Sequence, residues 1–314
     1  MSEGGAASYG TVFKIDPSGS LTTLHSFCSQ SGCTDGGYPY HAGLVQGKNG
    51  DFYGTTFEGG ANGFGTVFRI TSGGKFTTLY NFCSQTNCAD GENPAAGLIQ
   101  GKNGEFYGTT TAGGSTTCGA CGGTVFRITP SGKLTTLYSF CALENCTDGQ
   151  DPATPLVQAA NGDFYGTTAS EGTNGYGTIF KITPGGKLTT LYNLCSQAAC
   201  ATNPSGLIQA TDGDFYGTMI DGGTNGSGTV FRVTPSGKLT TLYTFCTEGA
   251  PCLDGSGPEG GLVQATDGNL VRDNLGGRRP YRLLARIYRR DGFQDDHNRH
   301  ADDNIQLLLP NRVR

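Results

Sequence analysis

The sequence contains no tryptophan, only two methionines and few charged residues, and it has no long apolar run. A membrane-spanning helix needs about 18 or more consecutive apolar residues, so no membrane span is predicted. The first residues form neither a basic segment nor an apolar core, and no signal peptide is visible. Because only 35% of the residues are apolar, a core requires many short strands to share them.

Basic residues are scarce before residue 271. That part carries 11 Lys and Arg against 20 Asp and Glu, whereas residues 271–314 carry ten Arg, no Lys and six Asp. An acidic body without a basic stripe argues against nucleic acid as a partner. Glycine is abundant instead, at 53 of 314 residues, more than twice its usual share of about 7%, which indicates many tight turns.

Several short motifs recur along the chain in one fixed order. Leu-Val/Ile-Gln occurs five times and Phe-Tyr-Gly-Thr four times. Self-similarity at a regular period is the signature of a repeat architecture. The tetrad Gly-Thr-Val/Ile-Phe also occurs five times, with its threonine at Thr11, Thr66, Thr124, Thr178 and Thr229.

Residues 43–82 illustrate one repeat, in which four strand-like runs alternate with turns. Gly43–Gln46 and Asp51–Thr56 flank an Asn-Gly pair typical of a tight hairpin. Thr66–Thr71 and Lys75–Phe82 flank Ser-Gly-Gly, again turn chemistry. Four antiparallel strands per unit predict a β-propeller blade. Stacked sandwiches or an open solenoid are the alternative, but solenoid coils are usually shorter, roughly 20–30 residues.

The sequence therefore predicts an all-β fold, a β-propeller of four-stranded antiparallel blades within residues 1–270. Its complete units are 44–82, 98–140, 156–194 and 207–245, with half units at 11–27 and 262–270. If the two halves pair, they close a fifth blade. If they do not, unpaired strand edges remain, which are an aggregation hazard.

Both ends of the chain depart from the repeat. Residues 2–5 align with the middle of a unit, so we expect an internal start and a longer natural chain. Val271–Asn274 stands where Tyr-Gly-Thr-Thr is due, and the codons GTA-CGG-GAC-AAC for that tetrad read Tyr-Gly-Thr-Thr one base forward. We therefore expect a frameshift near Leu270 and a disordered or poorly folded tail at 271–314. A natural basic tail that binds acidic surfaces is the alternative.

Ten of the 12 cysteines form close pairs, each at the end of a unit's last strand. The pairs are Cys28 with Cys33, Cys83 with Cys88, Cys141 with Cys146, Cys195 with Cys200, and Cys246 with Cys252. Zinc sites usually bring two Cys-x₂-Cys pairs together, whereas these pairs lie on different units, so disulfides are favoured. Disulfides indicate an oxidising compartment. The last pair, Cys118 with Cys121, lies in a Gly-rich insertion, where a structural clip is favoured over a redox motif.

Two runs resemble the bacterial Gloeobacter–Verrucomicrobia (GloVer) tandem repeat: Asn103–Thr110 and Gly123–Phe140, which reads Gly-Thr-Val-Phe-Arg-Ile-Thr-Pro-Ser-Gly-Lys-Leu-Thr-Thr-Leu-Tyr-Ser-Phe. Every unit carries the resemblance, over residues 1–270. It implies a secreted or surface-anchored bacterial repeat protein, often with a C-terminal sorting segment that this chain does not show. It brings no catalytic residue with it. The Asn/Asp-Gly-x-Phe-Tyr-Gly-Thr element is also similar to the repeat of extracellular sensor propellers.

Any ligand is expected on the face of the propeller where the long Gly-rich and cysteine loops emerge, or at the channel mouth there. The candidate binding residues are acids that recur in these loops: Asp35, Asp90, Asp148 and Asp254 after the cysteine pairs, and Glu58, Glu171 and Asp221 in the Gly-rich loops. The fourth unit has Asn203 near the place of the first kind, and Ala112 breaks the second series.

For each acid the alternative role is structural, as a turn-forming residue or a solvated loop acid. No cofactor and no metal site are predicted. The open alternative is a ring of these carboxylates that binds Ca²⁺ or a polyhydroxylated ligand, which needs a clustering of oxygens that the sequence does not show.

Catalytic motifs are lacking, since neither Gly-x-Ser-x-Gly nor His-Glu-x-x-His occurs. The body contains only His25 and His41, and His25 stands where other units have Tyr. The sequence therefore favours a non-enzymatic extracellular binding or scaffold propeller, with a polysaccharide or a cell-surface protein as partner. The alternatives are a propeller hydrolase or lyase acting on polysaccharide, and a purely structural surface repeat protein. Oligomeric state and ligand identity have no signature in the sequence.

Overall fold

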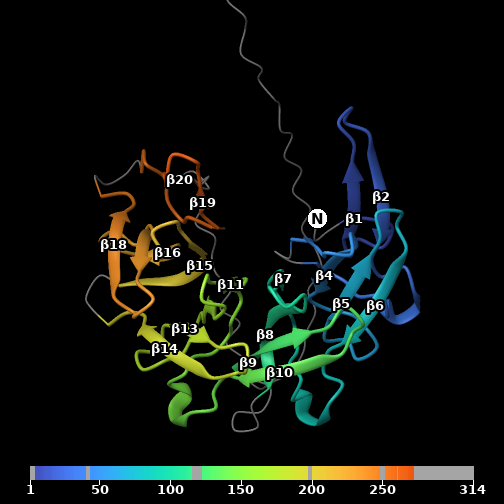
Figure 1. The fold of residues 1–314 in the computed structure, drawn as a ribbon, viewed down its shortest axis with the longest axis horizontal. Coiled ribbons are helices and arrows are strands. Elements are labelled where there is room, and N and C mark those ends of the chain that lie inside the picture. The colour runs from blue at the N-terminus through green and yellow to red at the C-terminus, as the bar shows by residue number, and fades with distance from the viewer. Residues whose placement is uncertain are drawn as a thin grey trace, which may run out of the picture. The chain divides into compact units, whose positions relative to one another are not determined.

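The computed structural model of the chain describes residues 4–39, 43–114, 122–196, 200–247, 252–259 and 261–271. Within these ranges the regular structure is almost entirely β (Figure 1). Three single turns of 3₁₀ helix lie in the cysteine loops, and no helix there is long and apolar enough to cross a membrane. These turns are η1 (Ser31–Cys33), η2 (Thr86–Cys88) and η3 (Glu144–Cys146).

Four sheets, each of four antiparallel strands in chain order, correspond to the four predicted complete units. Sheet I comprises β3 (Val45–Gln46), β4 (Phe52–Thr56), β5 (Thr66–Ile70) and β6 (Phe76–Asn81). Sheet II comprises β7 (Ile99–Gln100), β8 (Phe106–Gly114), β9 (Gly122–Ile128) and β10 (Leu134–Ser139). Sheet III comprises β11 (Val157–Gln158), β12 (Phe164–Thr167), β13 (Thr178–Ile182) and β14 (Leu188–Asn193). Sheet IV comprises β15 (Ala201–Gln209), β16 (Phe215–Gly222), β17 (Thr229–Val233) and β18 (Leu239–Thr244).

The two half units form hairpins of their own. The N-terminal hairpin consists of β1 (Thr11–Ile15) and β2 (Leu21–Ser26), and the C-terminal hairpin of β19 (Val263–Gln264) and β20 (Leu270–Val271). Each hairpin is a separate two-stranded sheet. Among the described residues the two halves are therefore not joined into a fifth blade, and the predicted tail lies outside these residues from 272 onward.

The turns explain why each unit folds as two hairpins. Between β3 and β4 the Asn-Gly pair closes the chain, with the Gly50 N–H donating to the Gly47 carbonyl at 2.8 Å. Gly50 has a φ of 83°, a left-handed conformation that glycine adopts at little cost. The same register then recurs from unit to unit: Phe52 faces Ile70 in sheet I, and Phe106 faces Ile128 in sheet II.

Neighbouring sheets pack face to face through apolar side chains. The forward face of a sheet, which meets the next sheet along the chain, carries Val45, Tyr53, Val67 and Phe82 in sheet I. The backward face of sheet II that receives it carries Leu98, Phe106, Phe126 and Ile128. The rings of Tyr53 and Phe106 stack with centroids 4.0 Å apart. Equivalent side chains join sheets II and III and sheets III and IV. Each sheet is thus sandwiched between its neighbours, as blades are in a propeller.

The all-β propeller-type fold with four-stranded blades is confirmed by these sheets and their packing. The predicted cysteine pairs that fall within the described residues are confirmed as well. They form five disulfides whose α-carbons lie 4.0 to 4.6 Å apart, within bonding reach. These disulfides join Cys28 with Cys33, Cys83 with Cys88, Cys141 with Cys146, Cys195 with Cys200, and Cys246 with Cys252.

The sixth predicted pair falls between two of the described ranges. Both Cys118 and Cys121 lie outside the described residues, in the gap between 114 and 122. The disulfide between Cys118 and Cys121 therefore stays a prediction.

Candidate functional site

The cysteine loops share one design, which is built around an aspartate. In the loop between sheets I and II, Asp90 is fully buried. Its Oδ2 accepts hydrogen bonds from the Tyr80 phenol at 2.7 Å and from the Ser84 N–H at 2.9 Å, and its Oδ1 accepts one from the Gln85 N–H at 3.1 Å. Burial, together with the neighbouring Asp90, raises the pKa of Tyr80 to about 12. Hydrogen bonds of this kind are what a buried carboxylate needs to remain stable.

The predicted acids Asp35 and Asp148 occupy the same place in their own loops. Both are fully buried, and Asp148 accepts a 2.8 Å hydrogen bond from the Tyr138 phenol. His25 replaces the tyrosine at Asp35, with Nε2 3.0 Å from Oδ2. Asp254 is exposed, but it too accepts a hydrogen bond from a phenol, that of Tyr243 at 2.7 Å. The structure thus gives these four acids partners in their own repeat, and their role in ligand binding stays a prediction.

The predicted acids of the Gly-rich loops lie nearer the surface. Glu58 and Glu171 are exposed, while Asp221 is partly buried and accepts a hydrogen bond from the Asn203 amide. Among the described residues, none of the seven predicted acids belongs to a cluster of three His, Cys, Asp or Glu side chains with ligand atoms within 4.8 Å of one another. Their role in ligand binding also stays a prediction.

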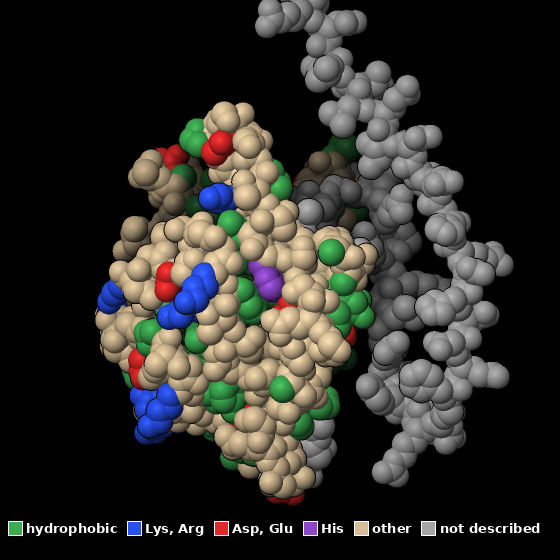
Figure 2. All heavy atoms as spheres, turned by 90° about the vertical axis from the view of Figure 1, so that its right-hand side faces the viewer, with side chains coloured by type: hydrophobic (Ala, Val, Ile, Leu, Met, Phe, Trp, Pro, Cys, Tyr) green, Lys and Arg blue, Asp and Glu red, His purple; other side chains and the backbone are tan. Residues whose placement is uncertain are grey.

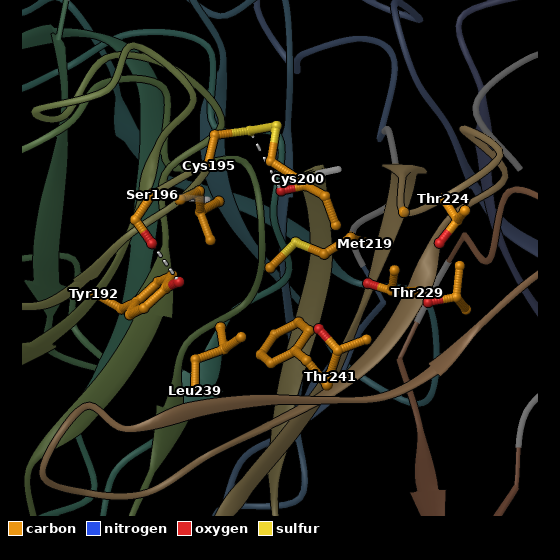
Figure 3. Close-up of a pocket in the computed structure, with 14 residues that line it drawn as sticks. Tyr192, Cys195, Ser196, Cys200, Met219, Thr224, Thr229, Leu239 and Thr241 are labelled. Carbon is orange, nitrogen blue, oxygen red and sulfur yellow. Dashed lines mark hydrogen bonds between the residues drawn. A yellow bond between two sulfur atoms is a disulfide. The ribbon is translucent and has the colours of Figure 1, made fainter. Parts of the chain in front are cut away.

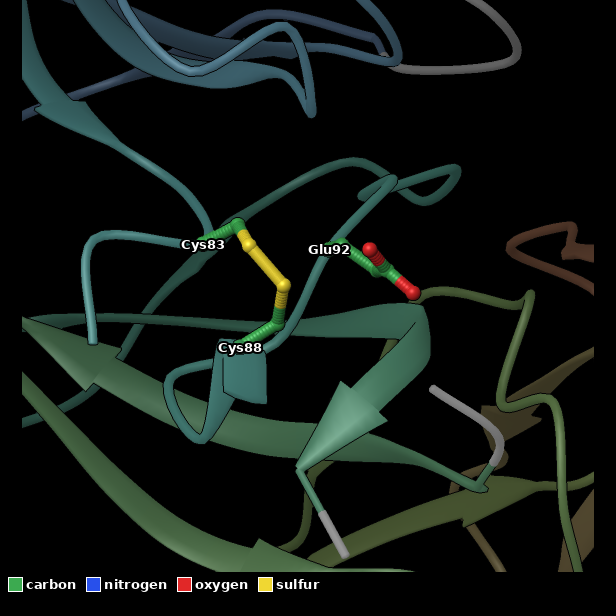
Figure 4. Close-up of side chains that lie close together, drawn as sticks. All are labelled: Cys83, Cys88 and Glu92. Carbon is green, nitrogen blue, oxygen red and sulfur yellow. A yellow bond between two sulfur atoms is a disulfide. The ribbon is translucent and has the colours of Figure 1, made fainter. Parts of the chain in front are cut away.

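One such cluster does occur in the described part of the chain. Cys83, Cys88 and Glu92 place their sulfur and carboxylate atoms within 4.8 Å of one another (Figure 4). The two sulfurs are bonded to each other, so they offer no thiolate to a metal ion. Glu92 is only 5% exposed, and burial raises its pKa. The next cysteine loop has the neutral Gln150 at this position, 3.7 Å from the sulfur of Cys141.

The joint between sheets III and IV departs from the common design. In the other four joints, five residues separate the second cysteine from the following X-Pro proline, but only three separate Cys200 from Pro204. The two residues that this joint lacks correspond to the Asp-Gly of the other joints. With that aspartate absent, the Tyr192 phenol forms its 2.7 Å hydrogen bond with Ser196.

The structure shows what the Asp-Gly turn fills elsewhere. In sheet II, Gly91 lies against Thr110 and Thr124 so closely that an added Cβ would clash with both hydroxyls. Those two hydroxyls are hydrogen-bonded to each other at 2.8 Å. Sheet IV has Met219 at the first threonine position and Thr229 at the second. No Asp-Gly turn covers this pair, so an opening remains.

That opening is a cavity of about 280 Å³, the sheet IV pocket, bounded by β14 and by residues of β15 to β18 (Figure 3). Its floor is apolar and consists of Leu194, Met219 and Phe231. Each of these side chains is at most 2% exposed. The Cys195–Cys200 disulfide forms part of the wall. Hydroxyls surround the floor, from Tyr192, Ser196, Thr224, Thr229, Thr241 and Thr244. None of the 14 lining residues is charged.

This arrangement suits an uncharged ligand that has an apolar face and polar edges. The hydroxyls can both donate and accept hydrogen bonds, and the floor offers apolar contact. The lining residues provide neither a cation for a phosphate or carboxylate nor an acid for a metal ion. Sequence reasoning missed this pocket. The signal for it in the sequence is the shortened joint after Cys200, which also displaces Asn203.

Comparisons with solved structures find similar chains at low sequence identity. A putative gluconolactonase is 14% identical, with a TM-score of 0.44 over 76% of this chain and 74% of that one. A luciferin-regenerating enzyme is 11% identical, with a TM-score of 0.47 over 81% and 72%. A putative 6-phosphogluconolactonase from Bacteroides uniformis is 14% identical, with a TM-score of 0.44 over 86% of each chain. No curated protein matches the sequence.

The family comparison covers the whole described fold. The family model of the Gloeobacter/Verrucomicrobia repeat matches residues 1–202 and 121–276. These ranges contain all four sheets and both hairpins, which confirms the resemblance that the repeated motifs indicated. The chain belongs to the Gloeobacter/Verrucomicrobia repeat family.

Proposed function

We propose that this chain is a non-catalytic binding module of the extracellular space or the cell surface, and that its sheet IV pocket binds one ring of a neutral polysaccharide. The observation that carries the proposal is the combination of an uncharged hydroxyl rim with an apolar floor formed by Met219 and Phe231. The pocket also occurs at the one joint where the Asp-Gly turn is missing.

The chemistry of a sugar ring matches this lining. A pyranose presents C–H groups on its faces and hydroxyls around its edge, so one face can lie over the apolar floor while Tyr192 and the exposed Thr224 and Thr241 bond the edge. At about 280 Å³ the cavity lies just below the usual range for small-molecule pockets, about 300–1,000 Å³. A single ring of a longer chain is therefore a better fit than an extended oligosaccharide.

The absence of carboxylates among the lining residues supports binding without hydrolysis. Glycosidases generally place two carboxyl groups about 5 to 9.5 Å apart around the bond that they cleave, and the 14 residues that line the pocket include none. The five disulfides support the extracellular part of the proposal, because such bonds persist in oxidising compartments.

The decisive experiment refills the pocket. Inserting Asp-Gly between Ala201 and Thr202 makes this joint read Cys-Ala-Asp-Gly-Thr-Asn-Pro, which parallels Cys-Ala-Asp-Gly-Glu-Asn-Pro at 88–94. Combined with Met219→Thr, it restores the design of the other joints. Calorimetry with a panel of neutral oligosaccharides should show that the wild-type chain binds a member of the panel and that the refilled chain has lost at least about tenfold in affinity, or about 1.4 kcal/mol.

The matched control is Thr240→Met, at an exposed position of β18 that does not line the pocket, and this variant should bind like the wild type. A reducing-sugar assay on the same panel should detect no product. The proposal fails if the wild-type chain binds no neutral sugar, if the refilled chain binds as well as the wild type, or if sugar is released.

A further inference from the structure

The N-terminal hairpin leaves its backward face uncovered. Phe13 is 40% exposed and Ile15 is 61% exposed, whereas the residues at the same positions in sheet I, Phe68 and Ile70, are fully buried. Phe68 and Ile70 are buried because they pack against the forward face of the preceding hairpin, which carries Val12 and Phe27. No preceding sheet supplies such a face to Phe13 and Ile15 among the described residues. Figure 2 looks at the right-hand side of Figure 1, where β1, β2, β5 and β6 lie, and shows apolar side chains scattered over that surface.

A second uncovered position lies beside this hairpin, on sheet I. Leu44 is 41% exposed, whereas the leucines at the same position in the next three units are 2 to 6% exposed: Leu98, Leu156 and Leu207. In the joint between sheets I and II, this leucine packs against Val45 and Tyr53, from the first two strands of the preceding sheet. In the described part of the chain the N-terminal hairpin supplies only a third and a fourth strand, and these do not cover Leu44.

The C-terminal hairpin has the opposite composition. It supplies a first and a second strand, and Val263 and Val271 are 66% and 55% exposed. Val45 and Tyr53, at the same two positions of sheet I, pack on sheet II instead. On the adjoining forward face of sheet IV, Leu242 is 48% exposed, because no third and fourth strands follow the C-terminal hairpin in the described residues.

The backbone edges of the two hairpins are complementary as well. In sheet I the second strand pairs with the third so that Phe52 faces Ile70 and Tyr53 faces Arg69. The repeat alignment transfers this register to the hairpins, where it sets Leu270 opposite Ile15 and Val271 opposite Lys14. Each strand has a hydrogen-bonding edge for the other, since among the described strands β20 is paired only with β19, and β1 only with β2.

We infer that the C-terminal hairpin of one molecule docks on the N-terminal hairpin of a second copy, and that the strands complete one four-stranded blade in the order β19, β20, β1, β2. The docked valines then cover Leu44, while Phe13 and Ile15 pack on the forward face of the incoming sheet IV. A second copy is the occupant because the two hairpins of one chain form separate sheets here and leave these side chains exposed. The contact is head to tail, which produces rings or filaments rather than a symmetric pair.

One substitution tests each side of this contact. Ile15→Asp places a carboxylate on the apolar face of the N-terminal hairpin, and Val263→Asp places one on the apolar face of the C-terminal hairpin. Both side chains are more than 60% exposed in the single chain, so neither change should impair folding, which circular dichroism verifies. Sedimentation velocity should show that the wild-type chain assembles with rising concentration, and that each variant alone associates roughly 100-fold more weakly, because an unpaired carboxylate is costly to bury.

An equimolar mixture of the two variants provides the sharpest result. The intact C-terminal hairpin of Ile15→Asp can still dock on the intact N-terminal hairpin of Val263→Asp, so the mixture should form dimers and stop there.

Leu253→Asp is the matched control, since Leu253 is 89% exposed and belongs to neither hairpin, and it should assemble like the wild type. The inference is overturned if the wild-type chain stays monomeric, as it would after closing a blade within itself. It is also overturned if either variant alone assembles normally or if the mixture remains monomeric.

Discussion

The phenol of Tyr138 donates a 2.8 Å hydrogen bond to the buried carboxylate of Asp148, ten residues further along the chain. It thereby ties the end of β10 to the cysteine loop, because the same carboxylate accepts the N–H of Ala142 at 3.0 Å. Burial and the adjacent Asp148 raise the pKa of Tyr138. We predict that Tyr138→Phe lowers the free energy of unfolding by about 1.5 kcal/mol, because a hydrogen bond to a charged group is lost. Urea denaturation measures the change.

The matched variant is Tyr192→Phe, because Tyr192 occupies the same position at the joint that lacks the aspartate. Its phenol bonds the exposed Ser196 at 2.7 Å, so the loss should be about 0.5 kcal/mol or less. Equal losses in the two variants would show that the buried carboxylate is not what makes this tyrosine important.

His25 makes one joint sensitive to acid. Burial lowers the pKa of His25 below its usual 6.5, although Asp35 acts in the opposite direction. Because the unfolded chain takes up this proton more readily than the folded chain, stability falls as the pH drops below about 6.5. We predict that His25→Tyr, which restores the residue of the other units, reduces the loss of stability between pH 7 and pH 5. Melting temperatures of both chains across that range test this, and parallel curves would contradict it.

Asp151 gives the opposite pH dependence. Burial raises the pKa of Asp151 to about 6, and its Oδ1 is buried without a hydrogen-bond partner. The equivalent residue after sheet I, Asn93, donates its amide to the Phe57 carbonyl at 2.9 Å. The folded chain holds the Asp151 proton more tightly than the unfolded chain, so stability falls as the pH rises from about 4 to about 6 and stays reduced above it.

We therefore predict that Asp151→Asn stabilises the chain by about 2 kcal/mol at pH 7.5. Burial raises the pKa of Asp151 from the ordinary 3.8 to about 6, which corresponds to roughly 3 kcal/mol, and the side chain's partial exposure reduces this value. At pH 4 the gain should be small. Urea denaturation at the two pH values distinguishes this from a general effect of the amide, which would appear at both.

The Cys83–Cys88 disulfide closes a loop of only a few residues. Replacing both cysteines with serine should lower the free energy of unfolding by about 2 kcal/mol, the loop-closure value for so short a loop. Serine at Cys141 and Cys146, an equal sequence separation, should cost a similar amount. The double-serine variants should also lose their response to a reductant at the altered loop, which thiol counting after unfolding can verify.

Adjacent residues were enough to predict the strands and turns. The Asn-Gly and Ser-Gly-Gly turns set the hairpins of sheet I at 43–82, and β4 begins at Phe52, one residue after the predicted start. The five described cysteine pairs followed from their position at the end of each unit. The burial and the hydrogen-bond partners of the acids could not be predicted in the same way. The sequence around a turn aspartate such as Asp90 is the same whether its carboxylate is buried or solvated.

The sequence by itself determined the repeat and the family, because the same motifs recur in every unit. It also determined the four-stranded unit and the five described disulfides, because hairpins and these disulfides join residues close together in the chain. Only the tertiary structure decided where space is left. The sheet IV pocket exists because residues of two sheets, among them Tyr192 and Met219, meet around a turn that is missing. The exposed faces of Ile15 and Val263 likewise depend on which sheet stands beside each hairpin. Packing between distant residues fills or leaves such space, so the shortened joint after Cys200 shows that a turn is missing but not which distant residues line the opening.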